Sequence, residues 1–341
     1  MKILVTGSLG FMGSHLVDYL HNQGHTVRGI DNLSTGHGSN TNPAAPTFKV
    51  DLVTEPELVA GIVEGFKPDI IYHLAAWAHE GLSQFCPIKI TENNYNATLN
   101  ILVPAIKAKV RRFVFTSSMS VYGDQVPPFN ESMERKPADI YAVAKTASEQ
   151  AIELLSSVHN FDYTIIRPHN VYGPRQTLSD PYRNVVGIFM RRALTGKDLI
   201  IYGDGEQTRA FSYIDDVTPY LAAAGWLQKA SKQIINIGPL EEFSINKLAD
   251  TILALNGHGE GIGKTYLPDR PLEVKHAFCT NDKAIDILGY KTSVTFEEGL
   301  QKMWDWAENL YLTTGIAEPH YLEQLEIVNE STPETWTKKS L

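Results

Sequence analysis

The chain has 341 residues, which is enough for a complete parallel sheet and a second, smaller domain. Its net charge is −9, and no cluster of lysines or arginines could follow a phosphate backbone, so we expect no nucleic-acid partner. No apolar stretch approaches the roughly 18 residues of a membrane span, and the first residues lack the features of a signal peptide, so we expect no membrane partner.

The first predicted element is a strand that ends in a glycine-rich turn. Residues 2–6 have the character of a strand with an apolar centre, and Gly7, Gly10 and Gly13 follow at intervals of three before a helical pattern over 11–23. In such a turn the first glycine allows a tight exit from the strand, the second leaves space for a dinucleotide, and the third lets the helix pack closely. We expect the turn to bind the pyrophosphate of a dinucleotide through Gly7, Gly10, Phe11, Met12 and Gly13.

A second strand pattern, 26–31, identifies the dinucleotide. It ends in Asp31, roughly 20 residues after the turn, where a carboxylate accepts hydrogen bonds from the adenosine ribose and repels a 2′-phosphate. We place the adjacent Asn32 in the same site. The sequence therefore predicts NAD, not NADP, as the cofactor.

Strand and helix patterns alternate through the first half of the chain. Further strands are predicted near 47–51, 69–74, 112–117 and 163–167, and helices near 55–65, 93–109 and 141–158. This alternation predicts an α/β fold with a doubly wound parallel Rossmann sheet, which binds ligands at the carboxyl ends of its strands.

Beyond about residue 170 the pattern changes to loops and short elements. We predict a Rossmann domain over 1–168, a smaller substrate-binding domain over 169–312, and a polar surface tail over 313–341. The apolar run 233–238 is expected to return to the main sheet, which would make the second domain discontinuous.

The strongest catalytic pattern joins Ser118, Tyr141 and Lys145. The tyrosine and lysine, four residues apart, share one face of the helix predicted over 141–158. An ammonium beside a phenol favours the phenolate, so we expect Lys145 to lower the pKa of Tyr141 toward neutral for proton abstraction from an alcohol. Ser118, after the fifth strand, would share that proton. An isolated pair of this spacing is more typical of an exposed helix face, but the preceding dinucleotide turn favours an active site.

Together these motifs resemble the extended short-chain dehydrogenase/reductase family, and within it the NAD-dependent nucleotide-sugar epimerases and dehydratases, most of all the UDP-glucose 4-epimerase-like enzymes. The resemblance covers about residues 1–310. It implies that NAD is also contacted by Asp51, Leu52, Leu74, Ala75, Ala76, Asn94, Tyr141 and Lys145.

The same resemblance implies a nucleotide-sugar site, with a UDP-sugar the commonest substrate. Asn170, Arg209 and Arg270 would hold the diphosphate, which suits the bidentate geometry of guanidinium groups. Ser118 and Ser120 would lie beside the sugar.

The residues after Ser118 separate the possible reactions. Sugar 4,6-dehydratases that resemble this chain carry an Asp-Glu pair where it has Met119 and Ser120, and GDP-mannose 3,5-epimerases have a cysteine at the second position. C4 epimerisation remains, because it needs only hydride transfer and one proton shuttle. The implied reaction removes the O4 proton and the C4 hydride, rotates the 4-keto sugar, and returns the hydride to its other face.

Two further positions bear on the sugar. Ala277, seven residues after Arg270, corresponds to a gate residue in hexose 4-epimerases, and its small side chain predicts that N-acetylhexosamines fit as well as hexoses. The segment that holds Trp77, His79 and Glu80 departs from typical epimerases. These residues could recognise a hydroxyl, uronate or amide group of the sugar. They could instead supply a second acid–base group, or they could only pack the loop.

Alternatives remain open. Proton transfer by Glu80 would permit dehydration or C3/C5 epimerisation through the same 4-keto intermediate. A non-catalytic NAD-binding regulator is a third interpretation, against which the intact set of Ser118, Tyr141 and Lys145 argues.

Assembly and location follow from smaller signals. The two predicted helices over 93–109 and 141–158 carry more apolar residues than a single face against the sheet requires, namely Leu99, Ile106, Ile152 and Leu155. This surplus predicts a homodimer that forms through two helices of each subunit. Pro104 should kink or break its helix. Cys86 and Cys279 lie far apart without a C-x-x-C partner, so we expect no disulfide framework, no metal site and a cytoplasmic location.

Overall fold

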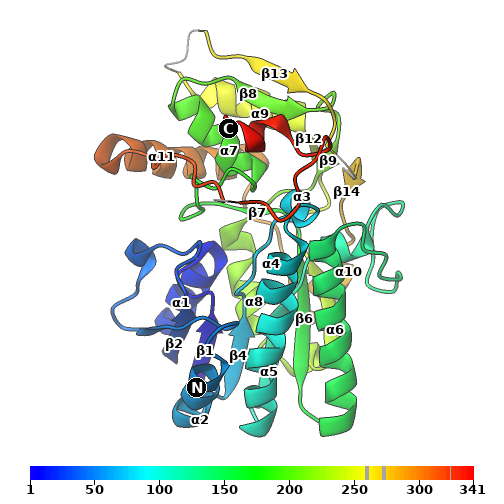
Figure 1. The fold of residues 1–341 in the computed structure, drawn as a ribbon. Helices are drawn as coiled ribbons and strands as arrows, with labels where there is room; N and C mark the ends of the chain where they lie inside the picture. The colour runs from blue at the N-terminus through cyan, green and yellow to red at the C-terminus, as the bar shows by residue number, and fades with distance from the viewer. Residues whose placement is uncertain (258–260, 271–273, 323) are drawn as a thin grey trace.

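The computed structural model describes residues 1–257, 261–270, 274–322 and 324–341 (Figure 1). Its centre is a seven-stranded parallel sheet in the order β11-β6-β5-β4-β1-β2-β3. The strands are β1 (Lys2–Thr6), β2 (Thr26–Asp31), β3 (Thr47–Lys49), β4 (Ile70–His73), β5 (Arg112–Thr116), β6 (Tyr163–Pro168) and β11 (Gln233–Ile237). This order confirms the doubly wound α/β fold, and β11 returns from the second half of the chain as predicted.

Helices cover both faces of the sheet (Figure 1). One face packs against α1 (Phe11–Asn22) and α8 (Thr218–Ala223), and the other against α2 (Pro56–Phe66), α5 (Ala97–Lys107) and α6 (Ile140–His159). The alternation of side chains along β1 shows why, since Ile3 and Val5 enter the first core and Leu4 enters the second.

The helical region before β5 differs in detail from the prediction. It consists of α4 (Pro87–Thr91), a π-helical turn (Glu92–Asn96) and α5, which continues through Pro104. Pro104 therefore does not break the helix, because Ile101 and Ala105 on either side of it are buried in the core.

Three of the four apolar side chains on which we based the dimer prediction pack within the subunit. Ile152 is fully buried in the chain's own core, and Ile106 and Leu155 pack partly against the same core. These three side chains therefore already have contacts within one subunit.

Most elements of the second half lie above the carboxyl ends of the strands, where Figure 1 shows α7, β8 and β9, but the helix over 282–288 packs against β11 of the main sheet. The elements of this half include β7 (Val171–Tyr172), α7 (Val185–Leu194), β8 (Leu199–Tyr202), β9 (Thr208–Arg209), β10 (Ser212–Tyr213), β12 (Phe243–Ser244), α9 (Ile245–Leu255), β13 (Lys264–Leu267), β14 (His276–Ala277), α10 (Asp282–Leu288) and α11 (Phe296–Thr314). Within the described residues, no helix has the length and apolar character needed to cross a membrane.

The described residues of 313–341, for which we predicted a polar surface tail, are mostly exposed, but a few of them pack against the rest of the chain. Residues 324–341 fold back onto the body of the molecule and contain α12 (Glu334–Thr337). Trp336 and Leu341 are buried in one apolar cluster together with Phe85 and Tyr182. A few widely spaced apolar side chains thus hold this segment, although its composition is polar.

Candidate active site

A cavity of about 380 Å³, the main cavity, opens at the carboxyl ends of the strands. It extends from the glycine turn past Ser118 and Tyr141 to β8 and Trp336. A smaller side cavity of about 90 Å³ adjoins it and shares Glu80, Gly81, Met119, Asn170, Arg209 and Arg270. One continuous site therefore joins the predicted cofactor, catalytic and substrate residues.

The glycine turn lies as the sequence predicts. Gly7 has φ +70°, and a Cβ there would lie 2.8 Å from the backbone N of Ala75. A Cβ on Gly13 would lie 1.9 Å from the Gly7 carbonyl oxygen, so only glycine lets α1 begin this close to the turn. Gly7, Gly10, Phe11, Met12 and Gly13 all line the main cavity.

Asp31 lies at the end of β2, buried and lining the cavity. Its carboxylate accepts hydrogen bonds from the backbone N–H groups of Leu9 (2.9 Å) and Leu33 (2.7 Å). These bonds fix its orientation and leave lone pairs available for a ligand.

The neighbouring polar residues form a second fixed group. Asn32 donates to Asp51 at 2.7 Å, and Asp51 also accepts from the backbone N–H groups of Val53 and Thr54. Although burial raises the pKa of Asp51, these hydrogen bonds outweigh it and lower the pKa below its ordinary value. Asn32, Asp51 and Leu52 line the main cavity.

After β4, Leu74, Ala75 and Ala76 also line the cavity, but Asn94 does not lie where we expected. Its side chain donates to the carbonyl oxygens of Trp77 (2.9 Å) and Ile90 (2.8 Å). The π-helical turn over Glu92–Asn96 turns this residue inward, and Asn93 faces the cavity instead. Asn94 thus supports the Trp77 loop.

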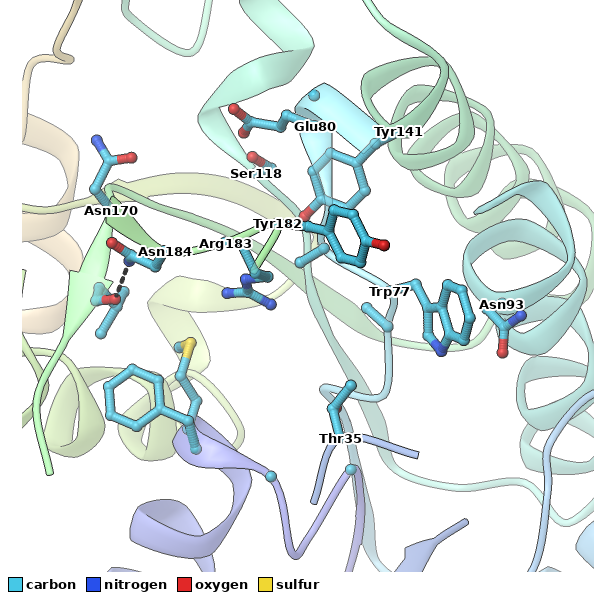
Figure 2. Close-up of a pocket in the computed structure, with 18 of the residues that line it drawn as sticks. Thr35, Trp77, Glu80, Asn93, Ser118, Tyr141, Asn170, Tyr182, Arg183 and Asn184 are labelled. Carbon is cyan, nitrogen blue, oxygen red and sulfur yellow. Dashed lines mark hydrogen bonds between the residues drawn. The ribbon is translucent and has the colours of Figure 1, made fainter. Parts of the chain in front are cut away.

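Ser118, Tyr141 and Lys145 all line the main cavity, and Figure 2 shows Ser118 close to Tyr141. Ser118 accepts a hydrogen bond from the Ser120 hydroxyl at 2.9 Å. Lys145 Nζ donates to the Thr116 carbonyl oxygen at 2.9 Å and lies 5.7 Å from the centre of the Tyr141 ring. The sheet edge and α6 therefore bring together the three residues that the sequence selected.

The charges around Tyr141 act against our expectation. Burial, and then the carboxylate of Glu80, raise the pKa of Tyr141 above its ordinary value, while the cation of Arg183 and the hydrogen bond with Ser118 oppose the increase. Burial also lowers the pKa of Lys145 to about 7, with Glu149 opposing and Arg183 contributing. In the chain by itself, desolvation thus outweighs the activation of Tyr141 by Lys145 that the spacing predicted.

Glu80 is the first residue of α3 (Glu80–Ser83) and faces both cavities. Figure 2 shows its carboxylate on the same side of the site as Ser118 and Tyr141. Asp139, the N-cap of α6, also lines the side cavity, and burial followed by the charge of Glu80 raises its pKa to about 7. Two carboxyl groups therefore lie close enough to Tyr141 for their charges to act on it.

The other residues of this loop have different roles. Trp77 lines the main cavity (Figure 2), whereas His79 is buried and hydrogen-bonded to Asp180 at 2.8 Å. His79 also lies edge-on against Trp77 and Tyr182. Its contacts are those of loop packing.

The predicted diphosphate residues converge on the boundary between the cavities. Asn170 lies between β6 and β7 and donates to the Ala210 carbonyl oxygen at 2.9 Å. Arg209 on β9 and Arg270 both face the two cavities. Ala277 on β14 pairs directly with Arg209 and lines the side cavity with Ser120, so the predicted gate lies beside the predicted diphosphate site.

Several residues that line the main cavity were not predicted from the sequence. Tyr182, Arg183 and Asn184 reach the cavity from the loop before α7, and Arg183 points into its centre in Figure 2. Trp336 reaches it from residues far along the chain. No periodicity or motif marks these positions, because their approach depends on the folded path of irregular segments.

The site fits a dinucleotide in two ways. The turn from Gly7 to Gly13 leaves a backbone cradle that a side chain would fill. Trp77 Nε1 and Thr116 Oγ1 are buried at the main cavity and have no hydrogen-bond partner within the part of the chain that the structure describes. They can serve a polar ligand there.

Comparison with known proteins gives consistent results. Residues 3–238 match the model of the NAD dependent epimerase/dehydratase family. The chain is 33% identical over 328 residues to a UDP-N-acetyl-alpha-D-glucosaminuronate decarboxylase of Bacillus cytotoxicus, covering 89% of this chain and 97% of the relative. It is 34% identical over 316 residues to the UDP-glucose 4-epimerase of Mycolicibacterium smegmatis, covering 91% and 99%.

A solved structure agrees with these matches. The UDP-glucose 4-epimerase of Thermotoga maritima, determined with UDP-glucose, superposes with a TM-score of 0.84 at 33% identity. The match covers 91% of this chain and 99% of that one. The similarity therefore includes the second half of the chain as well as the Rossmann sheet.

Proposed function

The chain belongs to the NAD-dependent epimerase/dehydratase family, and we propose that it is a nucleotide-sugar 4-epimerase, an isomerase that acts on UDP-hexoses and UDP-N-acetylhexosamines. One observation carries the proposal. Ser118, Tyr141 and Lys145 lie in the same cavity as the glycine turn on one side and Arg209 and Arg270 on the other.

The proposed base is Tyr141, which removes the proton from the sugar O4 while Ser118 shares its hydrogen bond. NAD, held by the glycine turn, Asp31 and the residues after β4, supplies the hydride acceptor, and the positive charge of its oxidised ring favours a nearby phenolate. Arg183 acts in the same direction, because its cation lowers the pKa of Tyr141. Lys145 is held in place by the Thr116 carbonyl oxygen.

The diphosphate would be held by Asn170, Arg209 and Arg270. Anchoring the substrate there leaves the sugar free to rotate beside Tyr141, so that either face of the 4-keto intermediate receives the returned hydride. The boundary position of these residues between the two cavities supports this assignment.

The side cavity bears on the choice of sugar. Glu80 and Asp139 line it together with Arg209 and Arg270, and carboxyl groups can accept hydrogen bonds from sugar hydroxyl groups. Ala277 leaves space there for an acetamido group. We therefore expect UDP-hexoses and UDP-N-acetylhexosamines to be substrates, and UDP-uronates, which are substrates of some relatives by name, are the comparison in the test below.

A second candidate has one observation in its favour. Asp139 has a pKa of about 7, raised in part by the charge of Glu80, and this pKa would suit proton transfer at C3 or C5 of the 4-keto intermediate. Met119 and Ser120 at the catalytic loop supply no acid for dehydration. Incorporation of solvent deuterium at C3 or C5, lost in Glu80→Gln, would identify this second activity.

We also propose a homodimer in the cytoplasm. Val103 on α5 and Leu154 and Val158 on α6 are 42%, 68% and 74% exposed, and such a large apolar surface on two adjacent helices favours a partner copy. Cys86 and Cys279 are both free and buried, which supports a reducing location.

The proposed function is tested by incubating the NAD-loaded protein with UDP-glucose, UDP-N-acetylglucosamine and UDP-glucuronate in turn and following the products by NMR. We expect the C4 epimers of the first two without net formation of NADH. Accumulation of a 4-keto-6-deoxy sugar or of a pentose would contradict the proposal.

A further inference from the structure

Residues 324–341, which we call the C-terminal strap, pass beside the main cavity. Figure 1 shows this red segment passing close to α3 and continuing to α12 and the chain end beside α7. Two of its residues, Trp336 and Leu341, line the cavity. The strap is therefore part of the wall of the site.

The strap is fixed to the Rossmann side of the cavity by backbone hydrogen bonds. The Glu326 carboxylate accepts from the first N–H groups of α4, those of Ile88 (2.8 Å) and Lys89 (2.9 Å). In return, the backbone N–H groups of Glu326 and Ile327 donate to the Phe85 carbonyl oxygen, each at 3.0 Å. An acidic side chain at a helix N-terminus is favourably placed.

It is fixed to the opposite side as well. The hydroxyl groups of Thr335 and Tyr202 are 2.6 Å apart, and Arg191 on α7 donates to the Leu341 carbonyl oxygen at 2.6 Å. The strap thus contacts both walls of the cavity through these hydrogen bonds.

Trp336 is the side chain that the strap places in the site. It is 4% exposed and lies edge-on against Phe85 and Tyr182, with ring centres 5.7 and 5.3 Å apart. A Cβ built on Gly81 would lie 3.5 Å from Cη2 of Trp336 and 3.7 Å from Nη1 of Arg270. The indole and the guanidinium therefore both approach the backbone at Gly81.

The surroundings indicate which ligand group this end of the cavity receives. The Arg270 guanidinium lies over the Tyr202 ring, 5.0 Å from its centre, and Ile200, Gln207 and Trp336 line the same cavity. Flat aromatic and apolar faces with one amide, next to a phosphate-binding arginine, suit a nucleobase.

We propose that Trp336 is a substrate-binding residue that contacts the base of the nucleoside diphosphate, and that the strap forms the wall of the nucleoside end of the site. This inference rests on the proposed function, because it takes Arg270 as a ligand of the diphosphate.

The test measures binding of UDP to the NAD-loaded protein by calorimetry, in the wild type and in Trp336→Ala, Trp336→Phe and Val328→Ala. Val328 is 63% exposed on the same strap and serves as the matched control. Loss of the aromatic contact should raise the Kd for UDP about tenfold or more in the alanine variant and less in the phenylalanine variant. The Kd for NAD should not change in any variant.

Two outcomes would overturn the inference or its premise separately. If the wild type binds UDP and Trp336→Ala binds it equally well, Trp336 does not contact the ligand and the inference fails. If the wild type binds none of UDP, GDP, CDP or dTDP, the proposed function fails with it.

A fluorescence readout separates contact from a structural role. UDP should quench the emission of Trp336, so the change on adding UDP should be smaller in Trp336→Phe, which keeps an aromatic ring between Phe85 and Tyr182. An identical change in the two proteins would contradict the inference, even if the alanine variant had lost affinity through unfolding of the strap.

Discussion

The two ends of the main cavity differ in which parts of the chain form their walls. At the cofactor end, backbone at the carboxyl ends of β1, β2 and β4 forms most of the wall, and side chains such as Asp31 are fixed by backbone N–H groups. At the substrate end the wall consists of side chains from short, separate segments, including Arg209, Arg270 and Trp336.

This difference indicates how the two ends can change. The cofactor end depends on local geometry, since a Cβ at Gly13 would collide with the Gly7 carbonyl oxygen, and almost any substitution there is costly. The substrate end depends on individual side chains, so single substitutions can alter the choice of sugar or nucleotide while the fold is kept.

The largest expected effect lies between the two ends, at Tyr141. Tyr141→Phe keeps the ring but removes the phenolic oxygen, so kcat should fall roughly 10²- to 10⁴-fold while NAD and UDP bind as before. Steady-state kinetics with calorimetry test this, with Tyr311→Phe, an exposed tyrosine on α11, as control. Near wild-type turnover would remove Tyr141 from the mechanism.

At the cofactor end, Asp31 should determine which dinucleotide binds. Repulsion between this carboxylate and a 2′-phosphate should make NAD bind roughly 100-fold more tightly than NADP. Asp31→Asn removes the charge but keeps a side-chain oxygen, so it should reduce the difference between the affinities for NAD and NADP. Equal affinities of the wild type for both dinucleotides, measured by calorimetry, would refute the assignment.

At the substrate end, Ala277→Tyr should change which sugars the enzyme accepts. A phenol ring in the side cavity should lower kcat/KM for UDP-N-acetylglucosamine roughly tenfold or more and largely spare UDP-glucose, because steric exclusion acts on the larger sugar. Ala277→Ser is the size-matched control. A similar loss with both sugars would show that Ala277 is not a gate and would leave Glu80 and Trp77 as the candidates for sugar selection.

The smallest effect on chemistry is expected outside the cavity, at Leu154. Leu154→Glu places a charge on the exposed apolar surface of α6 and should convert the proposed dimer into a monomer in light scattering, while the NAD-binding end stays intact. Glu64→Gln, on the exposed side of α2, is the control. A wild type that is monomeric at all concentrations would contradict the dimer.

The sequence predicted the sheet, the glycine turn and the set of Ser118, Tyr141 and Lys145, because strand periodicity and short-range spacing record local geometry. It misplaced Asn94, since a single π-helical turn changes which side chain faces inward. It missed Arg183 and Trp336, whose positions depend on long-range packing. It also gave the wrong direction for the pKa of Tyr141, because burial cannot be read from a spacing of four residues.

The central claim is that the hydride removed from C4 returns to C4. The most direct test uses UDP-glucose with deuterium at C4, incubated with the NAD-loaded protein and analysed by NMR and mass spectrometry. We predict that the C4 epimer retains the deuterium at C4. Deuterium found at C6, as in dehydration, or lost to solvent would contradict the account.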